Sequence, residues 1–205
     1  MQSPYFGLDE SERRHLTQML IEKHPLKDIL VSVVLKSWDD IFNSQIGSFS
    51  IGKEIFPSPQ IISFFVHELI AQYLSLKYPD RYKVGELKNE KDVHDMLDPK
   101  MGIEIKGSSN PTQIFANRSY AQPSSDSEEK DKNGYYLTFN FEKISKTNPR
   151  PKILRISFGY LEHSDWVAQA SATGQQARLR TEAYRDKLVI LYDHRYESRP
   201  QNNLF

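Results

Sequence analysis

The sequence predicts a mixed α/β (α+β) fold, because helical and strand-like hydrophobic patterns occupy different parts of the chain. Apolar residues recur with a helical period in three segments near the N-terminus, over residues 8–24, 29–42 and 58–76. They alternate with polar residues over 135–144 and 152–160, which is typical of half-buried strands. We therefore expect a sheet flanked by helices, with a helical extension at the N-terminus.

The helical extension is expected to occupy the first 56 residues. Its first helix begins near Asp9 or Ser11 and is interrupted by Pro25, and its second helix presents one continuous apolar face. We interpret the pair as a packing or dimerisation element, although helices that only cover the core would show the same pattern. The predicted organisation is an N-terminal helical region at 1–56 followed by the core of the protein at 57–205.

The third helix has a strong start signal. Ser58 suits the N-cap, and Pro59 suits the first helical position. Glu68 lies at the edge of the apolar face of this helix. A carboxylate at that position needs a partner, and His67, Lys77 or solvent would provide one.

The segments between and after these elements have weaker patterns. Residues 111–121 are expected to form a short helix, and residues 122–134 are polar and acidic without periodicity, which indicates a surface loop. Residues 161–185 are expected to be mainly helical or looped. The continuous apolar run at 187–192 is suited to a buried strand.

Composition excludes several classes of protein. The chain has 205 residues, 38% of them hydrophobic and 26% charged, which is typical of a soluble globular domain. It has no cysteine, which excludes a disulfide framework and a thiolate zinc site. We find no membrane-span or signal-peptide pattern and expect a cytoplasmic protein. With 27 basic and 27 acidic residues, the chain is not a general nucleic-acid coating protein, but a local basic cleft remains compatible with this balance.

The most informative stretch is GIEIKGSS at residues 102–109, which reads as a short strand. Side chains alternate along a strand, so Ile103 and Ile105 share one face while Glu104 and Lys106 share the other. A carboxylate and an ammonium group suit a core poorly. They suit a site that holds a hydrated metal ion beside a phosphate.

A second carboxylate is expected opposite Glu104. Asp92 begins a short extended run, and turn-forming residues separate it from the strand that carries Glu104. The segment therefore predicts a hairpin in which Asp92 comes level with Glu104. Asp95 and Asp98 are rivals for this position, but Asp98 precedes a proline and reads as a turn residue, and we prefer Asp92. His94 would point to the same side and is expected to be a local hydrogen-bonding group.

These residues form the pattern D-x(11)-E-x-K, which resembles the PD-(D/E)XK nuclease signature. The longer stretches IEIKGSSNPTQIFANRSYAQ and SFGYLEHSDWVAQASATGQQARL resemble the ScaI-type family of type II restriction endonucleases. The likeness extends from about Pro57 to about Asp193. The chain departs from the signature at Lys91, where a proline often precedes the first aspartate.

The resemblance implies a restriction-endonuclease-like core, with a central mixed sheet flanked by helices. It implies a type II restriction endonuclease that cleaves double-stranded DNA at a specific sequence and leaves 5′-phosphate ends. The expected partners are a palindromic DNA site, a second copy of the chain in a homodimer, and a cognate DNA methyltransferase in the same system, with no membrane.

Magnesium is the expected cofactor, and manganese is expected to substitute for it, because hard carboxylate oxygens suit these ions. Asp92 and Glu104 would be metal ligands, with the carbonyl oxygen of Ile105 as a possible third. Lys106 would lie near the attacking water and stabilise negative charge on the phosphate. In this superfamily an acidic residue on the helix before the hairpin often supplements the site, and Glu68 is carried over as a catalytic residue on that basis.

DNA contacts are expected from two later segments. Arg118 is predicted to clamp a phosphate, although an arginine that orders the following loop would look the same. The segment SATGQQARLR is rich in side chains that bond to base edges, although an exposed amphipathic helix would share this composition. An alternative role for the loop at 122–134 is to close over bound DNA, but the acidic residues at its centre disfavour that role. The predicted DNA-binding residues are Ser108, Ser109, Asn110, Asn117, Arg118, Gln175, Gln176, Arg178 and Arg180.

Two other functions are compatible with the sequence. A repair or junction nuclease of the same fold would read DNA shape rather than sequence. A DNA-binding module without catalysis is disfavoured, because a degenerate site is expected to lose at least one of Asp92, Glu104 and Lys106.

Overall fold

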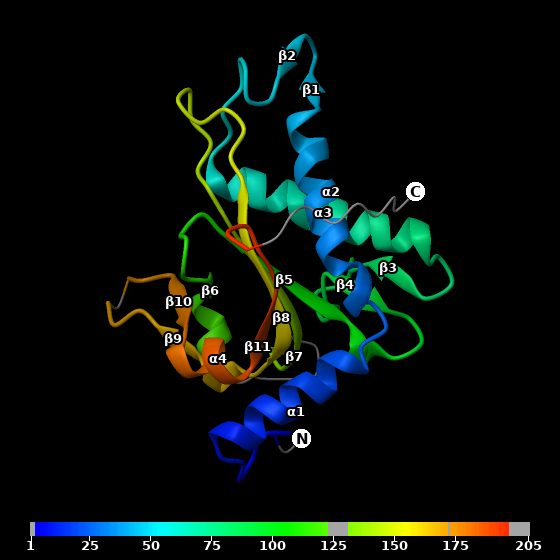
Figure 1. The fold of residues 1–205 in the computed structure, drawn as a ribbon, viewed down its shortest axis with the longest axis vertical. Coiled ribbons are helices and arrows are strands. Elements are labelled where there is room, and N and C mark those ends of the chain that lie inside the picture. The colour runs from blue at the N-terminus through cyan, green and yellow to red at the C-terminus, as the bar shows by residue number, and fades with distance from the viewer. Residues whose placement is uncertain (1–2, 123–130, 172, 197–205) are drawn as a thin grey trace.

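The centre of the protein is a six-stranded mixed sheet (Figure 1). The computed structural model describes residues 3–122, 131–171 and 173–196. The strand order is β11-β8-β7-β5-β4-β3, with β5 and β7 parallel and the other neighbours antiparallel. This sheet, flanked by helices, confirms the predicted fold class. Its strands are β3 (Tyr82–Val84), β4 (Val93–Asp95), β5 (Ile103–Ser108), β7 (Gly134–Phe141), β8 (Ile153–Leu161) and β11 (Leu188–Asp193).

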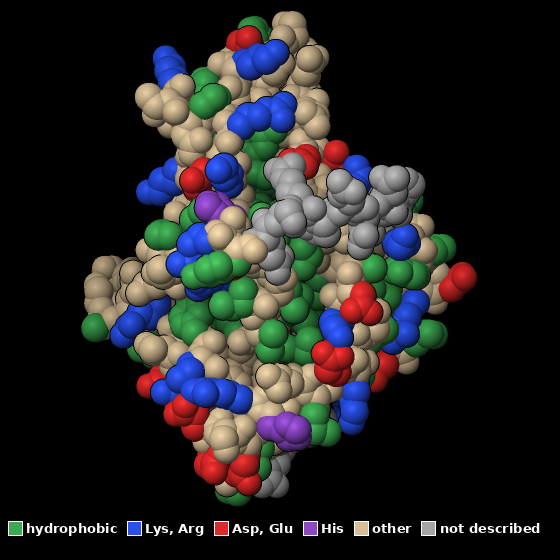
Figure 2. All heavy atoms as spheres, in the orientation of Figure 1, with side chains coloured by type: hydrophobic (Ala, Val, Ile, Leu, Met, Phe, Trp, Pro, Cys, Tyr) green, Lys and Arg blue, Asp and Glu red, His purple; other side chains and the backbone are tan. Residues whose placement is uncertain are grey.

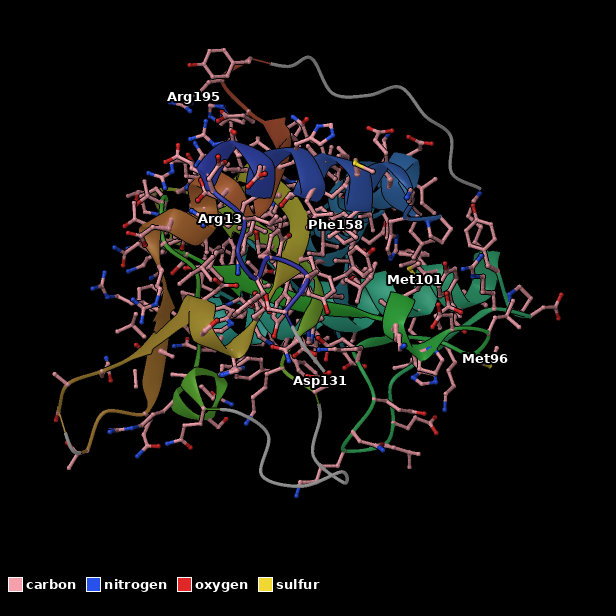
Figure 3. The ribbon with its side chains drawn as sticks, turned by 90° about the horizontal axis from the view of Figure 1, so that it is seen from below. Arg13, Met96, Met101, Asp131, Phe158 and Arg195 are labelled. Carbon is pink, nitrogen blue, oxygen red and sulfur yellow. The ribbon has the colours of Figure 1, made fainter. Side chains whose placement is uncertain are left out.

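Three helices pack on one face of this sheet: α1 (Glu10–Glu22), α2 (Leu30–Phe42) and α3 (Pro59–Lys77). Their apolar side chains share a single core with alternate residues of the strands, such as Ile105 of β5 and Phe139 of β7. Figure 3 shows α1 lying over the strand that carries Phe158. The three helices predicted from hydrophobic periodicity are therefore confirmed. Short 3-10 helices lie at Lys27–Ile29 (η1), Pro99–Met101 (η2), Arg118–Ala121 (η3) and His163–Asp165 (η4).

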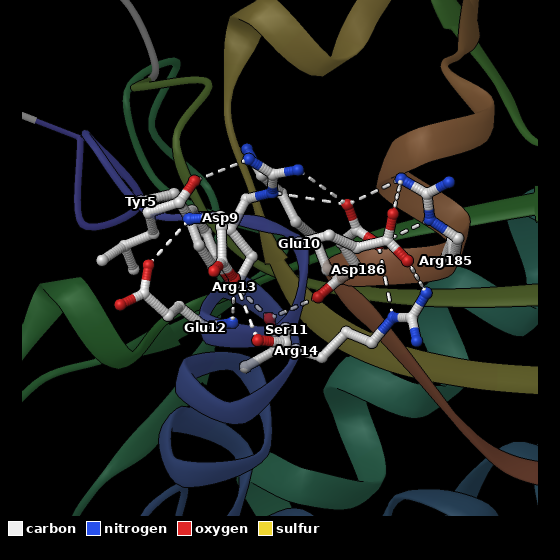
Figure 4. A network of polar contacts seen from close by, with 12 residues as sticks. Tyr5, Asp9, Glu10, Ser11, Glu12, Arg13, Arg14, Arg185 and Asp186 are labelled. Atoms are coloured by element: carbon white, nitrogen blue, oxygen red, sulfur yellow. Dashed lines mark hydrogen bonds and ion pairs between the residues drawn. The ribbon is translucent and has the colours of Figure 1, made fainter.

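Helix α1 begins at the predicted N-cap. The Asp9 side chain accepts a hydrogen bond from the Glu12 backbone N–H, and the Glu12 side chain accepts one from Asp9, so the two residues form a capping box. Polar contacts tie the helix to the far end of the chain (Figure 4). Arg13 donates to Asp186 Oδ2, and Arg185 also bonds to Asp186, which lowers the pKa of this carboxyl group below its usual value. The N-terminal helices thus cover the core, and a role in dimerisation stays a prediction.

The other face of the large sheet packs against a small antiparallel sheet in the order β6-β10-β9. Tyr136 of β7 faces this second core, together with Trp166 and Leu179. Because Tyr136 pairs with Glu104 in the register of β5 and β7, Glu104 lies on this same face. The strands of the small sheet are β6 (Phe115–Asn117), β9 (Trp166–Ala168) and β10 (Gln176–Leu179).

Two predictions of secondary structure were wrong. Residues 111–121 contain a strand and a 3-10 turn rather than a helix, and residues 161–185 contain β9, β10 and a helix limited to α4 (Thr181–Asp186). The strands β6 and β10 form because they pair with each other, although they are distant in the sequence. Their local hydrophobic patterns are too short to reveal such pairing. Residues 123–130 of the predicted surface loop lie outside the described residues.

The strand at 187–192 is present as β11, but it is an edge strand rather than a fully buried one. It pairs with β8, and the side chain of Ile190 is 53% exposed. An edge position leaves one side of the strand open to solvent, so the expectation of complete burial was wrong.

One end of the molecule projects beyond the sheets (Figure 1). It is formed by the short hairpin β1 (Gln45–Ile46) and β2 (Phe49–Ser50) and by the connection between β7 and β8. Lys and Arg side chains gather over this end in Figure 2. Within the described residues, none of the helices has the length and apolar character needed to cross a membrane.

Candidate active site and DNA-binding cleft

Asp92 lies directly before β4 and beside the backbone of β5. The pairing of Val93 with Ile103 is antiparallel, so the next pair outward joins Asp92 and Glu104. The Ile105 N–H donates a hydrogen bond of 2.6 Å to Asp92 Oδ2. The hairpin therefore places Asp92 opposite Glu104 on the neighbouring strand, as the turn-forming residues between them predicted.

Glu104 is a buried carboxylate with a cationic neighbour. Its side chain is 1% exposed, and Lys106 Nζ donates a hydrogen bond of 2.6 Å to Glu104 Oε1. The Tyr120 hydroxyl donates to the same oxygen, and the Lys106 ammonium lies 4.6 Å from the centre of the Tyr120 ring. Burial and the neighbouring negative charge of Glu104 raise the pKa of Tyr120. Such a buried charge is tolerated because a cation and a hydroxyl compensate for the lost hydration.

His67 also belongs to the site, although the sequence indicated it only as a neighbour of Glu68. Its Nε2 lies 2.9 Å from Asp92 Oδ2 and 3.0 Å from the carbonyl oxygen of Ile105. Glu68 follows it by one residue on α3 and therefore points about 100° away around the helix. Among the described residues, the Glu68 side chain has no hydrogen-bond or ion-pair partner, and its catalytic role stays a prediction.

The rivals of Asp92 have structural partners. Asp95 is buried and accepts hydrogen bonds from Arg81 Nε and from the backbone of the following turn. Asp98 accepts from the Lys100 N–H, as its proposed turn role requires. His94 lies 3.8 Å from Glu90 and is a local partner on β4.

Lys91, where the chain departs from the nuclease signature, has contacts within the fold. Its ammonium group lies 5.3 Å from the centre of the Tyr136 ring and donates to the carbonyl of Asp131. Its side chain therefore packs on the sheet face that also carries Glu104.

A cleft of about 690 Å³ opens where β5 ends, directly after Lys106 in the chain. It lies between the first turn of α3, the loop after β5 and the small sheet. The predicted DNA-binding residues Ser108, Ser109, Asn110 and Gln176 line it, together with Lys143 from the connection between β7 and β8. The fold thus brings two sequence segments predicted to contact DNA into one cleft.

The remaining predicted contacts divide into two groups. Arg178 is exposed on β10 and lies on the same side of the strand as Gln176, because side chains alternate. Asn117 is exposed on β6 and pairs with Gln176, and Gln175 is exposed just before β10. These side chains are available to a ligand in the cleft or at its rim.

Two arginines have internal partners instead. Arg118 donates to the carbonyl oxygens of Ser171 and Gly174, at 2.8 and 3.0 Å, and its own N–H bonds to Gln175. Arg180 donates to the Ser164 carbonyl. The geometry at Arg118 favours the alternative in which this arginine orders a loop, and both guanidinium groups hold the small sheet together.

A family described as ScaI restriction endonuclease matches residues 3–192. The chain belongs to the ScaI restriction endonuclease family. It is also 42% identical, over 193 residues, to the type II restriction enzyme ScaI of Streptomyces caespitosus, an alignment that covers 93% of this chain and 85% of the relative. No solved structure shows a significant match.

Membership of this family confirms the predicted type II restriction endonuclease. The match begins at residue 3, so the family likeness includes the N-terminal helices and is longer than the span from Pro57 that the sequence indicated. Helices α1 and α2 share their core with the large sheet and are part of the fold of this enzyme.

The donor atoms of this restriction endonuclease fit a hard divalent cation. Among the described residues, no group of three or more His, Asp and Glu side chains is placed to hold a metal ion. However, Asp92 Oδ2 and the Ile105 carbonyl oxygen converge, since both lie within 3.0 Å of His67 Nε2. Mg²⁺ takes one or two carboxylates and keeps several waters, so Asp92, the Ile105 carbonyl and the nearby Glu104 are a suitable set of oxygens.

Proposed function

We propose that this enzyme is a magnesium-dependent, site-specific deoxyribonuclease that hydrolyses phosphodiester bonds of double-stranded DNA and leaves 5′-phosphate ends. The observation that carries the proposal is the convergence of Asp92 Oδ2 and the Ile105 carbonyl oxygen, on the strand that also presents Glu104 and Lys106. Family membership supports the nuclease activity, and the chemistry of these oxygens supports the choice of cation.

Asp92, Glu104 and the Ile105 carbonyl would hold Mg²⁺, and Mn²⁺ would substitute for it. The ion, when bound, supplies Lewis-acid stabilisation of the negative charge that develops on the phosphate. Lys106 orients the attacking water and stabilises the same charge with its ammonium group. Its hydrogen bond to Glu104 Oε1 holds that ammonium on the face of β5 that carries the carboxylate. Glu68 is retained as a supplementary acidic residue of the site.

The DNA duplex would lie along the cleft after β5. Ser108 ends the strand that carries Glu104 and Lys106, and Ser109 and Asn110 follow it directly, so the three would contact the DNA backbone next to the scissile phosphate. Gln176 and Arg178 on β10 would read base edges, because amide and guanidinium groups make paired hydrogen bonds in the major groove. Asn117 and Gln175 lie beside them on the small sheet.

The biological unit would be a homodimer on a palindromic site. A two-fold dimer supplies one active site for each strand of DNA, and its symmetry matches that of the site. The first 56 residues are proposed to contribute to this dimer. The enzyme would act in the cytoplasm beside a DNA methyltransferase that protects the same sequence.

The proposal is tested by cleavage of unmethylated, sequence-diverse plasmids with Mg²⁺ present or chelated, followed by sequencing of the fragment ends. Discrete fragments with 5′-phosphates are expected from the wild type. Lys106→Ala is expected to lower the rate by a factor of about 100 or more, as removal of a charge-stabilising donor does in other active sites. Lys100→Ala, which alters an exposed lysine in the turn of the same hairpin, is the matched control and should retain the wild-type rate.

Other outcomes would change the assignment. Nicking or a smear of fragments would indicate a nuclease that reads DNA shape. Binding without cleavage across all the DNAs would indicate a module without catalysis. Full activity in the presence of a chelator would contradict the metal dependence.

A further inference from the structure

The contacts of His67 determine where one of its protons lies. Its Nε2 is within hydrogen-bond distance of Asp92 Oδ2, at 2.9 Å, and of the Ile105 carbonyl oxygen, at 3.0 Å. The carbonyl oxygen is only an acceptor, and Asp92 Oδ2 already accepts from the Ile105 N–H. His67 Nε2 must therefore carry a hydrogen, which the two oxygens share.

This N–H lies between two oxygens that are proposed to hold a divalent ion. Mg²⁺ binds through the lone pairs of oxygen ligands, and the His67 N–H is directed at lone pairs of these same two oxygens. A ring nitrogen that carries a hydrogen has no lone pair with which to bind a cation. The ion and the His67 N–H therefore compete for the same two oxygen atoms.

We propose that His67 is a positioning residue that occupies the metal site of the ion-free enzyme and withdraws when the divalent ion binds. The inference rests on the proposed function, because it requires the ion to bind at Asp92. In the absence of the ion, the shared hydrogen bond keeps the Asp92 carboxylate and the Ile105 carbonyl oriented toward a common point. The cost is a weaker affinity for the ion, since the hydrogen bonds have to be broken first.

The surroundings allow His67 to withdraw without disturbing Asp92. The His67 side chain is 27% exposed, so its ring can turn toward solvent from its place on α3. The Ile105 N–H continues to hold Asp92 Oδ2 at 2.6 Å, which keeps the carboxylate against β5 when the ring has left. Mg²⁺ prefers oxygen ligands, so the ring gains nothing by staying as a nitrogen ligand.

The test measures metal affinity rather than cleavage. Mn²⁺ is titrated into the full-length protein without DNA, and binding is followed by calorimetry and by the loss of the free-ion signal in electron paramagnetic resonance. His67→Ala is expected to bind Mn²⁺ roughly three- to tenfold more tightly than the wild type, which is the effect of removing a hydrogen bond of ordinary strength. His67→Gln keeps an N–H donor on the side chain and is expected to lie closer to the wild type.

Two controls separate the effect from general damage. His15→Ala alters an exposed histidine on α1 and should leave the Mn²⁺ affinity unchanged. Thermal unfolding in a chelator should show a lower midpoint for His67→Ala, because the ion-free site has lost its shared hydrogen bond. Added Mn²⁺ should then raise that midpoint by more than it raises the wild-type midpoint, since stabilisation grows with affinity.

The outcomes distinguish this inference from the proposed function. If Asp92→Asn binds Mn²⁺ as well as the wild type does, the ion is not held at Asp92, and the proposed site fails together with the inference. If Asp92→Asn weakens binding while His67→Ala leaves it unchanged, the site stands and the inference is wrong. A His67→Ala variant that binds Mn²⁺ more weakly than the wild type would likewise overturn the inference and identify His67 as a ligand.

Discussion

The Tyr120 hydroxyl donates a hydrogen bond to Glu104 Oε1, the oxygen that also accepts from Lys106 Nζ. Tyr120 belongs to the 3-10 turn after β6, whereas Glu104 is on β5 of the large sheet. The contact therefore joins β5 to the small sheet that carries Gln176 and Arg178. A displacement of the small sheet by bound DNA would reach the Glu104 carboxylate through this hydrogen bond.

Tyr120→Phe is expected to destabilise the protein by about 1.5–3 kcal/mol, because a hydrogen bond to a buried charged group is lost without a change in ring volume. The cleavage rate should fall as well, since Glu104 and Lys106 lose a neighbour that orients them. Urea unfolding measures the first effect and plasmid cleavage the second. Tyr196→Phe, at an exposed position, is the control. A stability equal to that of the wild type would show that the contact contributes nothing.

Gly107→Ala is expected to destabilise the protein by about 1–3 kcal/mol, because helix α3 lies too close to β5 to admit a side chain there. A Cβ atom at this position would lie 2.3 Å from Ser63 Oγ and 2.4 Å from the Phe139 ring. Adding Ser63→Gly to Gly107→Ala should restore part of the stability, since it removes one of the two clashes. Thermal unfolding of the wild type and the two variants tests this, and an unchanged midpoint for Gly107→Ala would refute the close packing.

Stability is expected to fall as the pH drops from 6.5 to 5, because of His24. Burial lowers the pKa of His24 from 6.5 to about 4, so below pH 6.5 the unfolded chain binds a proton that the folded protein does not. Protons therefore favour the unfolded state in this range, and roughly 1.5 kcal/mol of stability should be lost. Urea unfolding at both pH values measures the loss. His24→Gln should show a flatter dependence, and an equally steep one would assign the effect to other groups.

Arg178 and Arg118 are expected to respond differently to alanine substitution. Arg178→Ala should weaken DNA binding. If the side chain contacts a phosphate, the slope of log affinity against log salt concentration should decrease in magnitude by about one. If the side chain contacts a base, the variant should instead show a relaxed sequence preference. Arg118→Ala should instead lower the thermal midpoint, because Arg118 holds the carbonyls of Ser171 and Gly174. Fluorescence anisotropy at several salt concentrations, beside thermal unfolding, separates the two. The reverse result would restore Arg118 as a phosphate clamp.

Hairpin geometry explains why much of the site was predictable. Glu104 and Lys106 lie on β5, and Asp92 directly precedes the neighbouring strand β4. Alternation along a strand decides which side chains share a face. The three N-terminal helices were predictable for a similar reason, since each carries its own apolar period. The likeness to the restriction endonuclease family rested on these residues and on the stretch that follows them.

Other members of the site were not predictable from local pattern. His67 lies on α3 and contacts Ile105, which is 38 residues away in the chain, and no sequence period marks it as different from its neighbours. Tyr120 appeared in a segment that was expected to be helical, and the pairing of β6 with β10 decided otherwise. Arg118 was equally suited to a phosphate or to a loop, and the structure shows it on loop carbonyls.

The sequence by itself determined the mixed α/β class and the hairpin that brings Asp92 level with Glu104, because these depend on hydrophobic pattern and on contacts between residues close in the chain. Its resemblance to the ScaI-type family rested on longer stretches of residues, and the family match confirms it. Only the tertiary structure decided that His67 shares its N–H between Asp92 and the Ile105 carbonyl, and that β10 lines the cleft beside Ser108. Such contacts depend on how separate elements pack, and packing is the joint result of many distant side chains that no local pattern encodes.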